Sequence, residues 1–178
     1  MDIIVIDNFF PDKIAQSFCD VMAKQKFEFY WPGDNAVPNF HWHIKDCPMA
    51  FAVHTHMPEK LIGKLRLCDF YSNSHTHGVY PSKHSDFQSG AGKAYTAIYY
   101  PEMEWKEEWG GGLYIFNDDK VHRLIGYKGN RLVFFDASYD HQAAGIMPAA
   151  NYLRISNVLK YSSDIGDGFV PLDFTKIN

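Results

Sequence analysis

The spacing of hydrophobic residues separates a helical first part of the chain from a β-rich second part. A short β-branched run at residues 3–6 stands between two aspartates and predicts a buried strand. Pro11 can open a helix, because the N–H that proline lacks would have no partner in the first turn. Apolar residues then recur at helical spacing as far as Gln25, and they predict a helix with one packed face. The expected face consists of Ile14, Phe18, Val21 and Met22.

Residues 30–58 show neither a helical nor a strand period. The segment combines prolines and a glycine with many aromatic and histidine residues, which predicts irregular structure. A second short helix is expected at residues 58–64.

The second part of the chain consists of short β-like runs separated by turn residues. Regular short strands of this kind predict a β-sandwich or barrel. We therefore expect a mainly β protein with flanking N-terminal helices. The expected strands are residues 67–72, 94–100, 112–116, 121–127, 131–136 and 152–161.

Composition narrows the class of protein. The length of 178 residues fits one domain spanning residues 1–178. Hydrophobic residues make up 46% and aromatic residues 16%, which excludes a disordered chain. A net charge of −4 argues against broad binding of nucleic acid, whose affinity comes mainly from neutralised phosphates. The three cysteines form no CxxC pair, and we find neither a signal peptide nor a long apolar stretch. These features predict a cytoplasmic protein without a membrane span. The oligomeric state stays open.

The nine histidines include three pairs with HxH spacing. On a strand, such a pair points to one face and could bind a metal. Three competing pairs weaken each one, so surface or loop histidines near aromatics are the favoured interpretation. The pairs are His41/His43, His54/His56 and His75/His77.

The motif His84-Ser85-Asp86 places an imidazole and a carboxylate on one face. About one such match is expected by chance from the residue counts, so the motif alone is weak. His141 directly follows a hydrophobic strand and supplies a second imidazole. Two histidines and one aspartate form a facial triad, which leaves open metal positions and is typical of Fe(II) oxygenases.

Arg154 lies within an otherwise apolar expected strand. A buried guanidinium needs an anionic partner, because an unpaired buried charge is costly. A bound carboxylate would serve, since arginine forms bidentate bonds with carboxylates. A structural salt bridge with Asp136 or Asp140 is the alternative.

The order HxD, His, Arg on late β-strands resembles the Fe(II)/2-oxoglutarate-dependent dioxygenases, specifically their prolyl-4-hydroxylase-like branch. Three further stretches resemble family strands: residues 93–100, 109–116 with its Gly-Gly-Gly-Leu, and 131–135. The likeness spans about residues 67–161 and implies a double-stranded β-helix, or jelly roll. Residues 1–66 would then form its N-terminal helical support.

The resemblance implies a role for each candidate residue. His84, Asp86 and His141 would hold Fe(II). Arg154 and Tyr100 would bind the distal carboxylate of 2-oxoglutarate. Tyr71 is the candidate for a further co-substrate contact, with Tyr80 as its rival. Two departures stand out: the thirteen-residue interval from His141 to Arg154, and Lys160 where DNA-repair members of the superfamily carry a second arginine.

The implied activity is hydroxylation of a C–H bond with O2, releasing succinate and CO2, with ascorbate as reductant. The substrate could be a prolyl-type residue in a protein or a small molecule. Two alternatives stay open: a non-catalytic jelly-roll domain for binding or structure, and a cupin-like metalloprotein using His75 and His77. The aromatic segments 29–42 and 105–109 could form a substrate rim or belong to the core.

Overall fold

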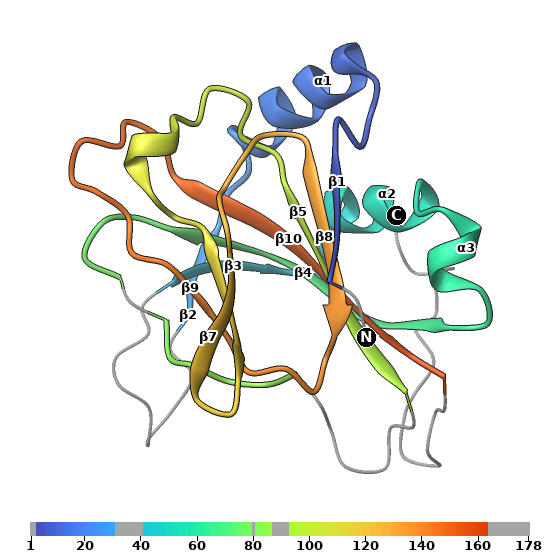
Figure 1. Ribbon diagram of the computed structural model, residues 1–178. Helices are drawn as coiled ribbons and strands as arrows, with labels where there is room; N and C mark the ends of the chain where they lie inside the picture. Colours follow the sequence, from blue (N-terminus) through green and yellow to red (C-terminus); the bar gives the residue numbers. More distant parts are fainter. Residues whose placement is uncertain (1–2, 31–40, 80, 87–92, 164–178) are drawn as a thin grey trace.

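The computed structural model describes residues 3–30, 41–79, 81–86 and 93–163. These form two antiparallel sheets with helices around them (Figure 1). The larger sheet has, in spatial order, β1 (Ile4–Asp7), β8 (Arg131–Asp136), β5 (Ala94–Tyr100), β10 (Arg154–Ser162), β4 (Arg66–His75), β3 (His41–Lys45) and β2 (Glu28–Tyr30). The smaller sheet has β7 (Lys120–Ile125), β6 (Leu113–Asn117) and β9 (His141–Ala143). The helices are α1 (Asp12–Met22), α2 (Pro48–Thr55), α3 (Glu59–Ile62) and the 3-10 turn η1 (Glu107–Trp109).

The central strands of the larger sheet are buried on both faces. Along β8, Leu132 and Phe134 belong to a core shared with α1 and α2, whereas Val133 and Phe135 belong to a core shared with the smaller sheet. The same alternation continues on β5 and β10, and it explains their nearly continuous apolar sequences. The predicted mainly β architecture is confirmed, and its two sheets pack face to face like a double-stranded β-helix.

Helix α1 forms where the proline predicts it, but its packed face differs in part from the expected one. Ile14 and Val21 are 48% and 41% exposed. Phe18 and Met22 are buried, together with the small residues Ala15 and Cys19. Small side chains allow the helix to lie closer to the sheet, and sequence hydrophobicity alone undervalued them.

The expectation of irregular structure throughout residues 30–58 is wrong for its second part, which contains β3 and α2. Helix α2 begins with Pro48 in its first turn and has apolar residues on several sides, so it shows no single stripe. Ala50 and Val53 face the core, and α2 packs against β10 and β4. The expected helix at 58–64 is present as the shorter α3.

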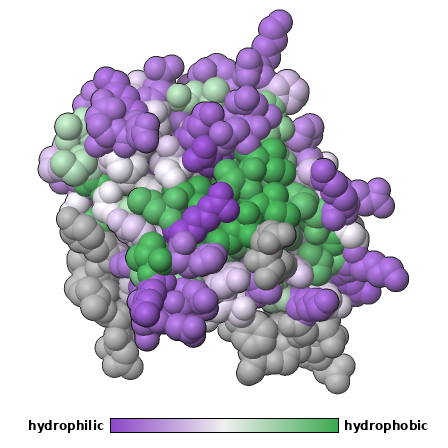
Figure 2. All heavy atoms as spheres, viewed as in Figure 1, coloured by the Kyte–Doolittle hydropathy of each residue, from purple (hydrophilic) through white to green (hydrophobic). Residues whose placement is uncertain are grey.

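The two cores show that α1, α2 and α3 cover one face of the larger sheet, whereas the smaller sheet and η1 cover the other. Figure 1 shows α2 and α3 together on the right, away from β7. On the face in view, hydrophobic residues gather in the middle with hydrophilic residues around them (Figure 2). Across the described ranges, no helix is both long and apolar enough to cross a membrane.

Candidate metal centre

The backbone brings His84, Asp86 and His141 to one place. His84 and His141 face each other in an isolated antiparallel bridge, with N–H···O distances of 3.1 and 2.8 Å. The Asp86 N–H donates to the Ala137 carbonyl at 3.1 Å, which fixes the other end of the motif. The short HxD segment therefore lies beside the start of β9, although the two are far apart in sequence.

The side chains of these three residues converge. Each offers one ligand atom, and these atoms lie within 4.8 Å of one another. Nε2 of His84 is 3.9 Å from Asp86 Oδ1, and Nε2 of His141 is 3.5 Å from Asp86 Oδ2. Two nitrogens and one carboxylate oxygen at this spacing can close around a single divalent ion.

Backbone carbonyls orient both imidazoles toward this common point. The Nδ1–H of His84 donates to the Ser82 carbonyl at 2.9 Å, and that of His141 to the Tyr139 carbonyl at 3.2 Å. We assign the tautomers from these contacts, so each Nε2 keeps its lone pair for a metal. Hydrogen bonds of this kind fix the orientation of histidine ligands in metal sites.

The electrostatics keep the cluster in its metal-binding form. Burial lowers the pKa of His141, which favours the neutral imidazole. Burial would raise the pKa of Asp86, but the Lys160 ammonium and the Thr96 hydroxyl beside the carboxylate outweigh it, so the pKa of that carboxyl is lowered. The Asp86 side chain is only 4% exposed, whereas that of His84 is 47% exposed, so the cluster is open to solvent on the His84 side.

Two further side chains hold the Asp86 carboxylate, and sequence reasoning placed neither in the site. The Thr96 hydroxyl on β5 donates to Oδ2 at 2.8 Å. The Lys160 ammonium on β10 donates to Oδ1 at 2.9 Å. Thr96 and Lys160 are direct cross-strand partners. Lys160 also shares a face of β10 with Arg154, since the two are an even number of residues apart, and that spacing was the available signal.

Arg154 begins β10 and is 2% exposed. Its Nε–H donates to the Gly111 carbonyl, and its guanidinium carbon lies 5.3 Å from the centre of the Tyr100 ring and 5.7 Å from that of Tyr127. Among the residues that the structure describes, no carboxylate pairs with Arg154.

The structural alternative for Arg154 therefore fails. Asp140 pairs with Lys83 at 3.4 Å, and the Asp136 carboxylate accepts hydrogen bonds from Ser138. Both acidic candidates are engaged elsewhere, so the buried guanidinium keeps its capacity for an external carboxylate.

The side chain of Tyr100, next to Arg154, carries a second buried polar group, its hydroxyl, whose hydrogen bonding has to be accounted for. Within the described part of the chain, this buried hydroxyl has no hydrogen-bond partner. Burial raises its pKa, and the nearby guanidinium offsets part of that rise. A buried hydroxyl without a partner is rare and needs an explanation. A carboxylate bound by Arg154 would accept its hydrogen bond, so the two side chains together fit a carboxylate group.

Tyr71 lies on β4 beside the cluster. Its ring centre is 5.4 Å from the Lys160 ammonium, and burial raises the pKa of its hydroxyl to about 12. Its rival Tyr80 lies outside the described residues.

The glycine-rich segment lets the backbone approach Arg154 closely. Gly110 and Gly111 have positive φ angles of 71° and 72°. A Cβ on Gly111 would come within 2.9 Å of the Trp105 ring and 3.3 Å of Arg154 Cδ. Trp105 and Trp109 are buried in the core between the sheets, so the core interpretation holds for them. Most of the segment 29–42 lies outside the described residues.

The remaining histidines form no comparable cluster among the described residues. His54 contacts Tyr161, and His56 packs against Phe10, as expected for histidines near aromatics. His75 was expected at the surface but is 6% exposed at the end of β4, where strand pairing with Arg154 buries it. The side chains of His41 and His43 lie outside the description.

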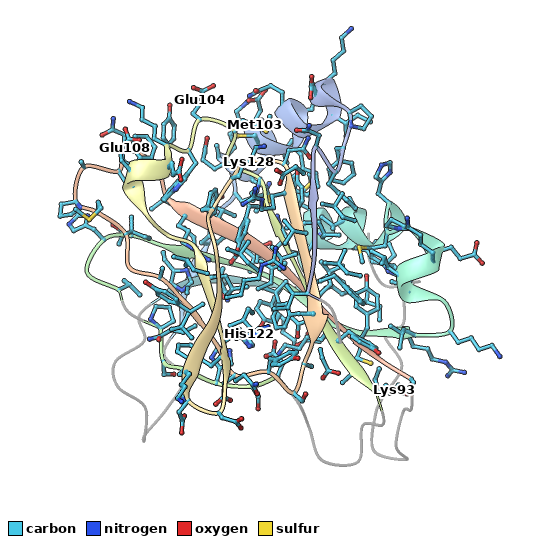
Figure 3. The ribbon with its side chains drawn as sticks, viewed as in Figure 1. Lys93, Met103, Glu104, Glu108, His122 and Lys128 are labelled. Atoms are coloured by element: carbon cyan, nitrogen blue, oxygen red, sulfur yellow. The ribbon has the colours of Figure 1, made fainter. Side chains whose placement is uncertain are left out.

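His122 offers a nearby histidine for comparison. It projects from β7 (Figure 3), and its ring stacks on Tyr139 at a centroid distance of 6.3 Å. It lies outside the ligand cluster, so it is a suitable control for substitutions there.

Comparison with known proteins gives the class to which this site belongs. The chain belongs to the 2OG-Fe(II) oxygenase superfamily, whose family pattern matches residues 68–156, half of the chain. The matched range contains the ligand cluster, Tyr100 and Arg154. No curated protein matches the chain.

Solved structures share the fold at low sequence identity. A prolyl-4-hydroxylase from Pseudomonas putida is 14% identical with a TM-score of 0.64, covering 91% of this chain and 92% of its own. A Trichoplax adhaerens prolyl hydroxylase, solved with a peptide fragment of hypoxia-inducible factor, is 15% identical with a TM-score of 0.63, covering 90% and 83%. HygX from Streptomyces hygroscopicus, solved with nickel and 2-oxoglutarate, is 13% identical with a TM-score of 0.63, covering 90% and 82%.

Proposed function

We propose that this protein is an Fe(II)- and 2-oxoglutarate-dependent dioxygenase that hydroxylates a C–H bond and releases succinate and CO2. The observation that carries the proposal is the convergence of His84, Asp86 and His141, whose ligand atoms lie within 4.8 Å of one another. Membership of the superfamily supports the same chemistry.

The residues of the cluster have distinct tasks in this proposal. The two Nε2 atoms and the Asp86 carboxylate would hold Fe(II) on one side and leave its other positions open. Thr96 keeps the carboxylate in place through its second oxygen. The bound iron supplies the oxidative chemistry with O2, and the protein binds and orients the reactants.

The distal carboxylate of 2-oxoglutarate would bind Arg154 and Tyr100. The buried guanidinium would donate charge-assisted hydrogen bonds, and the Tyr100 hydroxyl would donate one more. Both groups are nearly inaccessible to water, which strengthens these bonds. Tyr71 is proposed to contact the co-substrate near the metal end.

We propose a prolyl-type residue or a small molecule as the substrate. Prolyl hydroxylases among the structural neighbours support the first, and HygX, solved with hygromycin B bound, supports the second. A further structural neighbour, SnoN, is described as an epimerase, so proteins with this fold carry out more than one reaction. Hydroxylation is therefore the part of the proposal that goes beyond membership of the superfamily. Nucleic acid is not proposed, because the net charge is −4. A cytoplasmic location stays a prediction.

Turnover of the co-substrate tests the proposal. Purified protein is supplied with Fe(II), 2-oxoglutarate and ascorbate in air, and succinate is measured by mass spectrometry. In parallel, Fe(II) and 2-oxoglutarate are added without oxygen, and the visible charge-transfer absorption is recorded. We expect both signals in the unaltered protein and in His122→Ala, and loss of both in His84→Ala.

The result that contradicts the proposal is the absence of both signals in folded, unaltered protein. Absorption without succinate would instead favour the non-catalytic binding domain. Loss of metal on changing His75 but not His84 would favour the cupin-like alternative. Addition of one oxygen to members of a panel of proline-containing peptides and small amines would then identify the substrate class.

A further inference from the structure

Lys160 places a positively charged ammonium inside the proposed metal centre, next to one of the metal ligands. Its ammonium lies 2.9 Å from Asp86 Oδ1, and its side chain is 30% exposed. Asp86 is almost fully buried, so the pair is partly shielded from water. A lysine ammonium carries its charge at neutral pH, and the Asp86 carboxylate beside it favours the charged form.

Strand pairing fixes this lysine in the site. Lys160 lies opposite Thr96 on β5 and opposite Asp69 on β4. Thr96 and Lys160 each donate to a different oxygen of Asp86, so both oxygens are engaged by the protein's own donors. A metal that takes an Asp86 oxygen must therefore share it with one of these donors or displace that donor.

We propose that Lys160 is a positioning residue that acts as a resident counter-ion of Asp86 and competes with the divalent metal for its carboxylate. This inference rests on the proposed function, because it assumes that Asp86 is a metal ligand. Without metal, the ammonium neutralises the buried carboxylate and holds it in place. With metal, the ammonium lies close to a cation of like sign, so the lysine opposes metal binding.

Replacing Lys160 by methionine therefore has an unusual expected result: metal binding becomes tighter. Like charges a few ångströms apart repel appreciably even in water-like surroundings, and the lysine can relieve only part of this by moving. We expect the Mn(II) dissociation constant of Lys160→Met to fall on the order of tenfold. Lys160→Arg keeps the charge and should stay near the unaltered value.

Thermal stability supplies a second readout. Methionine fills a similar volume but leaves Asp86 without its counter-ion, so the metal-free variant should melt a few degrees lower. Saturating Mn(II) should then raise its melting temperature by more than it raises that of the unaltered protein. A merely structural lysine would lower stability without tightening metal binding.

The experiment is a Mn(II) titration followed by the electron paramagnetic resonance signal of the free ion. Lys83→Met is the matched control, because Lys83 adjoins His84 in sequence but pairs with Asp119 and Asp140 rather than with a ligand. We expect its Mn(II) affinity to change by less than about twofold, since an exposed charge is well screened.

Three outcomes decide the matter. Tighter binding by Lys160→Met and unchanged binding by Lys160→Arg would support the counter-ion. The proposal would be overturned if a folded Lys160→Met bound Mn(II) no more tightly than the unaltered protein. It would also be overturned if Lys160→Arg bound Mn(II) as tightly as Lys160→Met. Failure of the unaltered protein to bind Mn(II) would instead count against the proposed metal centre itself.

Discussion

The Arg154→Leu variant tests the proposed binding of 2-oxoglutarate, because it should lower the affinity for this co-substrate and leave the stability of the protein nearly unchanged. In the structure, the guanidinium is 2% exposed and faces the rings of Tyr100 and Tyr127 without a carboxylate partner among the described residues. A co-substrate carboxylate would gain a charge-assisted interaction there, and the net contribution of one such hydrogen bond is about 1.5–3 kcal/mol. Arg154→Leu should therefore weaken 2-oxoglutarate binding by about one to two orders of magnitude.

The stability of the same variant should change little. Leucine loses the hydrogen bond from Nε to the Gly111 carbonyl and the contact with the two tyrosine rings. It also removes a buried charge, which costs free energy when it lacks a carboxylate. Because these contributions oppose each other, we expect the free energy of unfolding to stay within about 1 kcal/mol of the unaltered value.

The assay titrates 2-oxoglutarate into Fe(II)-loaded protein without oxygen and follows the charge-transfer absorption. Arg123→Leu is the control, because Arg123 is exposed on β7 and donates only to the Ile3 carbonyl among described hydrogen bonds. Mn(II) binding should be normal in both variants. Unchanged 2-oxoglutarate affinity in folded Arg154→Leu would refute the co-substrate assignment, and joint loss of metal binding would point to general damage.

Three further predictions test the support of the site and of the fold. Thr96→Val removes the donor to Asp86 Oδ2 and should weaken Mn(II) binding about tenfold by titration, with succinate formation falling in parallel. Asp7→Asn should lower the free energy of unfolding by about 1 kcal/mol at pH 7, after allowance for exposure, because Arg131 and Lys128 lower the pKa of Asp7 to about 2. Urea unfolding curves should show this difference between the variant and the unaltered protein above pH 4, and the difference should be lost as the pH falls through about 2. Gly112→Ala would place a Cβ 2.6 Å from the Ile125 carbonyl oxygen, and thermal melts should show a loss of stability of about 1–3 kcal/mol. An unchanged stability would show that the backbone here can move apart to admit the Cβ.

The β-strands were predictable because local chemistry and the final fold agree there. Short apolar runs with turn residues between them predicted β5, β6, β7 and β8 to within a few residues. Helix α2 was missed, because a helix with apolar residues on several sides lacks the period that marks an amphipathic one. The packed face of α1 was only partly predicted, since Ala15 and Cys19 become core residues through close approach to the sheet.

The candidate site was predictable as far as sequence motifs reach. The HxD motif and a later histidine indicated the three residues that the structure brings together. The partner of Arg154 could not be decided from sequence, because Asp136 and Asp140 were equally near along the chain. The structure shows both engaged by other groups. Lys160 was noted only as a departure from a related pattern, because its contact with Asp86 joins residues 74 positions apart.

The pairing of β5 with β10 explains why these distant residues form one site. Alternation on β10 places Arg154 and Lys160 on the same face, and alternation on β5 does the same for Tyr100 and Thr96. Antiparallel register then sets Thr96 beside Lys160 at the metal end. Arg154, six residues before Lys160 on the same face of β10, contacts the ring of Tyr100. A slip of one residue in this register would turn one strand's polar pair toward the helices and abolish the site. The proposed metal centre and the proposed co-substrate anchor are therefore joined by the same ladder of backbone hydrogen bonds that holds the larger sheet together.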